Sequence, residues 1–459
     1  MIIYTAFKGR SALLGATLFV FFLLTWEACF QFGISDPYLY SVPSVILALL
    51  FDFAYIRTVI VYLFQVLLVS SVGGLGGLIS AVLLSRNRFL TKATISFAET
   101  AVWLPFLLPW SLPIWPVRPH NLASTIVPIW FTGIVAVGLW ICLQYLLKRT
   151  LLNQNWRAVR IQLVRESLLQ GAFISLIAQV WIRPYGWNWF MHTPSDGAAS
   201  GFAALLLLGL FQTVVYDIAP VDADDETQTH RILIDRFTLS AASAIIPWIL
   251  VVIIWHVLSV TGLAWLVSHP LLVLLQAYDL LAGAYIPLPN DNAVWSHLAF
   301  SSFELVCGLA CAVAVVLLTA RETSGRLKKL VEPIIVHGPL VVMVVPVFFV
   351  YWTPSVAVPL VAILSALVLS LRPMMNTLEQ NFRTLKMRGV LIATREALPL
   401  AFVGILFGEA IAGVKGLGFL MMTALHYPLP LEVPIAISTI CFLFFVITSL
   451  ALKLAIGRT

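Results

Sequence analysis

Long apolar segments dominate this chain and limit how it can fold. Of its 459 residues, 61% are hydrophobic and only 10% are charged, and apolar runs of about 18 residues or more recur along its length. Because a bilayer offers no water to backbone polar groups, only helices or a closed barrel can cross it. Continuous apolar runs favour helices over a barrel. The sequence therefore predicts an all-α polytopic membrane protein whose first helix is retained rather than cleaved as a signal peptide.

The apolar segments predict about twelve membrane-spanning helices. They lie near residues 11–32, 58–84, 93–116, 123–147, 166–184, 199–217, 237–260, 296–320, 331–352, 354–371, 397–414 and 430–452. With the N-terminus in the cytosol, nearly all of the 27 Lys and Arg residues fall on cytosolic segments, the exceptions being Arg57, Arg118, Arg183 and Lys415. The positive-inside rule therefore predicts a multi-pass protein of the inner (plasma) membrane with both termini in the cytosol.

A basic nine-residue segment occurs twice in the chain, as LNQNWRAVR at 152–160 and as LEQNFRTLK at 378–386. The Leu, Gln, Asn and first Arg are identical, whereas unrelated segments of this length would match at about one position. Residues 217–236 form a long, strongly polar stretch that is typical of a linker. We therefore expect two parallel six-helix halves, residues 1–216 and 237–459, joined by this cytosolic linker and related by a pseudo-twofold axis along the membrane normal.

Ionisable side chains inside apolar segments are costly to bury, which makes them candidates for a role in a transport pathway. These residues are Glu27, Glu99, His256, Glu304 and Glu409. Glu27 and His256 each follow a tryptophan near the middle of the first helix of a half, so they occupy equivalent positions. Both are pathway candidates, and hydrogen bonding between helices is the alternative role of each.

A second pair of pathway candidates follows the two basic segments. Gln179 and Glu409 lie at matching places in the two halves, and Glu409 precedes the motif Gly416-Leu417-Gly418. The pair differs in charge, so the sequence predicts that any charge-dependent step at this position uses only the second half.

The chain contains no nucleotide-binding loop, metal-ligand spacing or nucleophile motif. Its five cysteines fall in apolar stretches, where they are expected to pack. The glycines between 73 and 77, and the stretch from Cys307 to Cys311, are expected to let neighbouring helices approach closely. The sequence therefore predicts a protein that is not an enzyme, carries no cofactor or metal of its own and does not bind nucleic acid, since the net charge of +6 is explained by cytosolic loops.

Several features of the second half belong together. A Trp-led first span is followed by Pro270, as Trp26 is followed by Pro43 in the first half. Prolines recur at 333, 339, 346, 354 and 359, Asn376-Thr377 follows a basic turn, and Glu409 precedes GLGFLMMTA. This set, which covers most of residues 240–430, resembles the inner-membrane permeases of binding-protein-dependent ABC importers, specifically the nitrate, sulfonate and taurine branch.

The resemblance implies a permease subunit that works by alternating access on a small solute, such as nitrate, a sulfonate or taurine. Two cytosolic ATPase subunits would hold ATP and magnesium, and a periplasmic or extracellular solute-binding protein would deliver the solute. The two basic segments would be short coupling helices that dock on the ATPases. Their implied contact residues are Asn155, Trp156, Arg157, Arg160, Asn381, Phe382, Arg383 and Lys386.

Other interpretations of the sequence stay open. The basic segments can also be ordinary loops held by anionic lipid headgroups. A secondary transporter built from two parallel six-helix repeats would share the span count and the twofold axis, and would need a charged relay at mid-membrane. A polytopic membrane enzyme would need a cluster of His, Asp or Glu at one depth.

Overall fold

The computed structural model describes most of the second half and part of the first. The described residues are 53–101, 122–146, 241–261, 268–283, 294–321, 357–381, 387–412, 415–426 and 432–458, with a few isolated positions between them. These ranges are helical apart from short turns and contain no strand. The predicted helical class is therefore confirmed for this part of the chain, while the linker at 217–236 lies outside the described residues.

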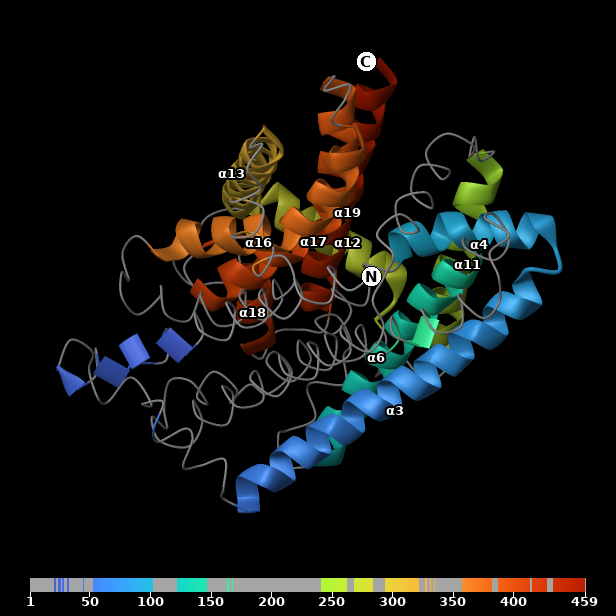
Figure 1. Ribbon diagram of the computed structural model, residues 1–459. Coiled ribbons are helices and arrows are strands. Elements are labelled where there is room, and N and C mark those ends of the chain that lie inside the picture. Colours follow the sequence, from blue (N-terminus) through green and yellow to red (C-terminus); the bar gives the residue numbers. More distant parts are fainter. Residues whose placement is uncertain are drawn as a thin grey trace, which may run out of the picture.

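Three helices come from the first half. They are α3 (Phe53–Leu84), α4 (Arg88–Ala101) and α6 (Leu122–Tyr145). A tight turn joins α3 to α4, because the Asn87 side chain accepts hydrogen bonds from the backbone of Phe89 (2.9 Å) and Leu90 (3.4 Å) and so caps the second helix. Helices α3 and α6 lie side by side (Figure 1).

Within the described residues, seven helices come from the second half. They are α11 (Ala241–Val260), α12 (Pro270–Ala282), α13 (Val294–Arg321), α16 (Ala357–Asn381), α17 (Met387–Ala412), α18 (Leu417–His426) and α19 (Glu432–Arg458). Helix α16 packs between α13 and α17, and α18 packs on α17 and α19. Three aromatic side chains in contact link this group to the first half. The ring centre of Trp248 on α11 lies 5.2 Å from that of Phe97 on α4 and 5.3 Å from that of Phe442 on α19.

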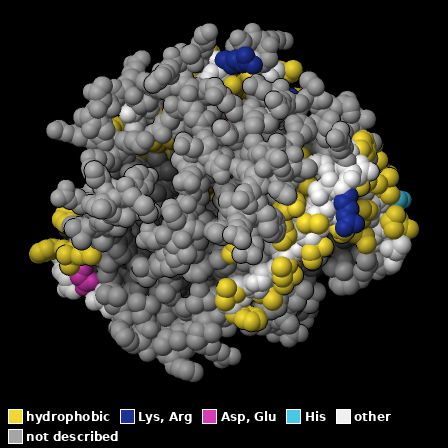
Figure 2. Space-filling model, turned by 45° about the vertical axis from the view of Figure 1, so that its right-hand side comes forward, with side chains coloured by type: hydrophobic (Ala, Val, Ile, Leu, Met, Phe, Trp, Pro, Cys, Tyr) yellow, Lys and Arg dark blue, Asp and Glu magenta, His cyan; other side chains and the backbone are white. Residues whose placement is uncertain are grey.

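Four helices in the described part of the chain are long and apolar enough to cross a membrane. The spans are Leu67–Leu84, Val294–Thr319, Met387–Ala410 and Glu432–Ile456. Large apolar side chains are exposed along α3 and α11, among them Phe64, Leu75, Ile79, Ile253 and Val257. Figure 2 shows a band of apolar side chains across one face of the molecule. Apolar exposure on this scale indicates contact with lipid.

The helices on either side of the second basic segment extend beyond the predicted spans. The predicted spans 354–371 and 397–414 leave a cytosolic segment between them, but α16 continues to Asn381 and α17 already begins at Met387. Hydropathy locates the apolar part of a helix, and it does not register where a helix continues into the polar region beyond the membrane. The connection between these two helices is therefore shorter than the gap between the two predicted spans.

Small residues bring α16 into close contact with both of its neighbours. A methyl group added to Gly308 of α13 would lie 2.7 Å from the Ala366 methyl, and one added to Gly404 of α17 would lie 2.7 Å from the Ser365 carbonyl oxygen. Gly408, one turn further along α17, faces the backbone of Ala362 at 2.8 Å in the same way. In lipid such contacts hold helices together, because apolar side chains gain little from leaving an apolar solvent.

The glycines of α3 allow close approach of a neighbouring helix, as predicted. Methyl groups on Gly73 and Gly77 would collide with the backbone of α6 at Ile134 and Gly138. The expectation of close helix approach is thus confirmed at both Gly73-to-Gly77 and Gly308.

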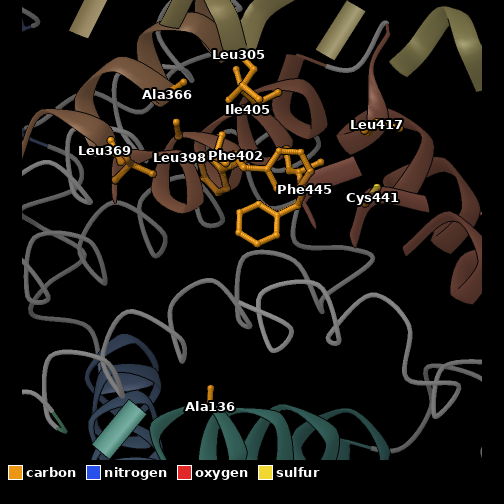
Figure 3. Close-up of a cluster of buried hydrophobic side chains, with 14 of the residues drawn as sticks. Ala136, Leu305, Ala366, Leu369, Leu398, Phe402, Ile405, Leu417, Cys441 and Phe445 are labelled. Carbon is orange, nitrogen blue, oxygen red and sulfur yellow. The ribbon is translucent and has the colours of Figure 1, made fainter. Parts of the chain in front are cut away.

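A buried apolar core lies where the second-half helices converge. The ring of Phe402 on α17 packs against two rings of α19. The distance between ring centres is 5.7 Å to Phe444 and 5.8 Å to Phe445. Figure 3 shows Leu305 of α13 beside Ile405 of α17 in the same cluster, while Ala136 of α6 lies apart from it in this view. This core fixes α13, α17 and α19 relative to one another.

We expect Gly408→Ala to destabilise the protein and Gly76→Ala to leave it intact. The added methyl at 408 meets backbone atoms of Ala362 that cannot move aside, at a cost of about 1–3 kcal/mol. Gly76 is also a helical glycine, but nothing lies within 4 Å of a methyl group there. Thermal unfolding in detergent should show a lower midpoint for Gly408→Ala alone, and equal midpoints for the two variants would contradict the described packing.

Candidate functional site

Most of the predicted coupling residues lie outside the described residues. Asn381 is the last residue of α16. The other residues of the two basic segments, Asn155, Trp156, Arg157, Arg160, Phe382, Arg383 and Lys386, and the pathway candidate Gln179, lie outside the described residues.

Glu27 and His256 take part in local links between segments. The Glu27 carboxylate accepts hydrogen bonds from the backbone N–H and the hydroxyl of Ser44, each at 3.1 Å. The ring of His256 on α11 stands edge-on to the ring of His269, 4.8 Å away between centres, just before α12. In both contacts the partner residue is next to a proline in the sequence, since Ser44 follows Pro43 and His269 precedes Pro270.

A second set of bonds fastens α11, α12 and α19 at the same place. The indole N–H of Trp255 donates to the Ser268 carbonyl at 2.8 Å, and the Ser268 hydroxyl donates to the Glu432 carboxylate at 2.7 Å. Glu432 opens α19, where a negative charge is favourable next to the helix N-terminus. The tryptophan singled out in the sequence therefore acts as a structural anchor.

Glu409 lies at the centre of the best-defined polar cluster. It is fully buried near the end of α17, at 0% exposure. One carboxylate oxygen accepts a short hydrogen bond from the Ser301 hydroxyl of α13, and the other accepts from the Gly418 backbone N–H at 2.7 Å. The Ser301 oxygen in turn accepts from the Leu417 N–H at 2.9 Å. Glu409 and Ser301 together satisfy two of the backbone donors that the first turn of α18 leaves unpaired.

The glycines after Glu409 make this arrangement possible. Gly416 has φ of +112°, a conformation that residues with a side chain rarely adopt, and a methyl group on it would overlap the Glu409 carboxyl group. A methyl group on Gly418 would overlap the Leu406 carbonyl. The motif Gly416-Leu417-Gly418 is therefore the turn that lets the start of α18 reach the carboxylate.

His297 holds the same turn from the other side. Its Nδ1 lies 3.0 Å from the backbone nitrogen and 3.2 Å from the carbonyl oxygen of Gly416, so it bonds to the backbone of this residue. The ring stacks on Phe419 of α18, with centres 6.0 Å apart. His297 is completely buried. Through His297 and Ser301, α13 therefore bonds to both Gly416 and Leu417 of the turn.

Glu304 completes the cluster one helical turn below Ser301. It is fully buried, and no described residue donates a hydrogen bond to either of its carboxyl oxygens. The Glu409 carboxyl group is its electrostatic neighbour. The site thus combines two carboxyl groups from two packed helices, one of which accepts hydrogen bonds from described donors while the other accepts none.

Ser301 and His297 were not identified from the sequence. A signal was present, because residues 297, 301, 304 and 308 recur at helical spacing and put polar or small side chains on one face of an otherwise apolar helix. Such a stripe indicates a buried polar contact. It does not identify the partner, which comes from α17 and α18.

No group of three or more His, Cys, Asp and Glu residues in the described part of the chain is placed to hold a metal ion. The chain as a whole matches no family model, no curated protein and no solved structure.

We expect Glu409→Gln to destabilise the protein and Glu304→Gln not to do so. Glutamine at 409 keeps one acceptor oxygen but turns its amide N–H groups toward a donor, which leaves a buried donor unpaired at a cost of about 1–3 kcal/mol. Glutamine at 304 can still donate to the Glu409 carboxylate and removes an ionisable group from the interior. Thermal unfolding should therefore show a lower midpoint for Glu409→Gln and an unchanged or higher one for Glu304→Gln. The reverse order would contradict the assigned bonding.

Proposed function

We propose that this chain is the transmembrane permease subunit of an ATP-driven ABC importer. In this proposal about twelve spans form two parallel six-helix halves, residues 1–216 and 237–459, around a pathway for a small solute, with a small anion as the substrate class implied by the resemblance. Separate ATPase subunits bind ATP and magnesium, and a solute-binding protein delivers the solute. The observation that carries the proposal is the duplicated basic segment at 152–160 and 378–386.

The packing of the second half supports a coupling role for that segment. Its second copy begins on the last residues of α16 and ends just before α17, so it joins two helices that are in close backbone contact through Gly404 and Gly408. A displacement of this connection acts on the pair together. Helix α17 then reaches from Met387 to Glu409, about 33 Å at 1.5 Å per residue.

The far end of α17 is where such a displacement would act on the rest of the bundle. Glu409 holds the first turn of α18 and the side chain of Ser301 on α13. Pro399 interrupts the hydrogen-bond ladder of α17 between the two ends and provides a point at which the helix bends. Movement of the cytosolic connection is therefore expected to change the contacts of α18.

A secondary transporter is the second candidate, and the buried Glu304 and Glu409 pair favours it. Ionisable groups at membrane depth mark proton or ion pathways in that class. Purification from membranes decides between the two candidates. A stoichiometric ATPase subunit bound to the chain supports the importer, and full transport by the isolated chain under an ion gradient without ATP supports the secondary transporter.

We expect Trp156→Ala and Phe382→Ala, together, to reduce transport-coupled ATP hydrolysis of the reconstituted complex at least several-fold while membrane insertion is unchanged. An aromatic residue between the same Asn and Arg in both copies is suited to fill a groove on the ATPase, and truncation of such an anchor costs about 2 kcal/mol or more.

The exchange variants Trp156→Phe and Phe382→Trp are the matched control, because each copy then carries the aromatic residue of the other. They should retain coupling. Unchanged coupling in the double alanine variant would exclude the coupling role of these segments.

A further inference from the structure

Two fully buried carboxyl groups meet where α13, α17 and α18 join. Glu304 and Glu409 are each 0% exposed and interact electrostatically. An unpaired charge in such surroundings is strongly unfavourable, and two like charges side by side are more so. We propose that Glu304 and Glu409 form a binding site for one exchangeable proton, carried by Glu304, and that release of this proton loosens the contact of α13 with α17 and α18.

The hydrogen bonds assign the charge to Glu409. Both of its oxygens accept hydrogen bonds, from the Ser301 hydroxyl and the Gly418 N–H. The Ser301 hydroxyl donates to Glu409, and its oxygen accepts from the Leu417 N–H. Every described donor around the pair thus favours a carboxylate at 409.

Glu304 has the opposite surroundings. No donor lies within hydrogen-bonding distance of its oxygens among the described residues. Since nothing there stabilises a negative charge and Glu409 already carries one, the proton of the pair belongs to Glu304. As a neutral acid Glu304 becomes a donor, and the Glu409 carboxylate is the acceptor next to it.

The other titratable groups around the pair come from α13, α16, α19 and the turn before α18. On α13 these are Cys307, one turn from Glu304, and His297, whose Nδ1 bonds to the Gly416 backbone. On α19 the group is the thiol of Cys441. Helix α16 presents Ala362 and Ala366 at this level, and its first titratable residue is Arg372 in its second half. Lys415, next to Gly416, lies over the Phe300 ring at 6.0 Å.

Burial links proton exchange to movement of the helices. Glu304 has no exposed surface, so its proton can leave only when the helices around it part. A second negative charge next to Glu409 then opposes their return. This inference concerns ion binding and does not depend on the assignment of the chain as an ABC permease.

Infrared spectroscopy of protein labelled with carbon-13 glutamate tests the proton site directly. We expect a protonated-carboxyl band at neutral pH that disappears reversibly as the pH rises in wild-type protein and is absent from Glu304→Gln. Glu27→Gln is the matched control, because Glu27 is a helical glutamate bonded to Ser44, and it should keep the band. A band that is missing from wild-type protein, or unchanged in Glu304→Gln, overturns the proposal. Loss of the band on adding sodium at constant pH would identify a cation site instead and also overturn it.

Native cysteines report the loosening of α18. Cys441 on α19 is fully buried against Met421 of α18, with the two sulfur atoms 3.6 Å apart, and Cys142 of α6 is buried far from α18 in sequence and serves as the internal control. We expect maleimide labelling of Cys441 relative to Cys142, measured by mass spectrometry, to rise about fivefold from neutral to alkaline pH, which corresponds to about 1 kcal/mol. In Glu304→Gln, or in Glu304→Met if the first variant does not fold, the ratio should stay constant. An equal rise in these variants, or a constant ratio in wild-type protein, overturns the coupling of proton release to α18.

Discussion

Close approach of helix backbones through small residues is the interaction on which the described bundle depends. Apolar side chains gain little by leaving lipid, so association in a membrane relies on packing and on hydrogen bonds between helices. Helix α16 supplies Ala362 and Ala366 as the receiving surface, with Gly308 of α13 on one side and Gly404 and Gly408 of α17 on the other. This arrangement brings α13 and α17 close enough for the polar groups on their facing sides to meet.

The polar cluster follows from that proximity. A glutamate at the end of an apolar helix must find donors, and the start of α18 offers backbone N–H groups that also need acceptors. Gly416 and Gly418 allow the chain to turn back closely enough for Glu409 to reach them. The spacing from Glu409 to the two glycines therefore describes one bonding unit, in which the carboxylate, the turn and the helix start depend on one another.

The sequence predicted the helical membrane class and the close approach at Gly73 to Gly77 and at Gly308. It also singled out Glu409, which lies at the centre of the polar cluster, while the pathway role expected of it stays a prediction. It could not identify Ser301 or His297, because a serine or histidine in an apolar helix has a role only through the helix that faces it. Glu304 was recognised as ionisable, but its neighbour is more than a hundred positions away along the chain. The extents of α16 and α17 were also missed, since hydropathy follows the thickness of the bilayer and not the length of a helix.

ATPase coupling and proton binding, as proposed, both involve the contact between α13, α17 and α18. If force from an ATPase reaches Glu409 along α17, it acts on the same contact that a proton on Glu304 holds closed. Two ligands that bias one conformational equilibrium must affect each other's binding to the same extent. Proton occupancy at Glu304 would then favour one conformation of the bundle, and the conformation imposed by the ATPases would change the affinity for the proton. Under these two proposals the permease would sense pH without transporting protons, because the site would control how easily the helices part and need not connect the two sides of the membrane.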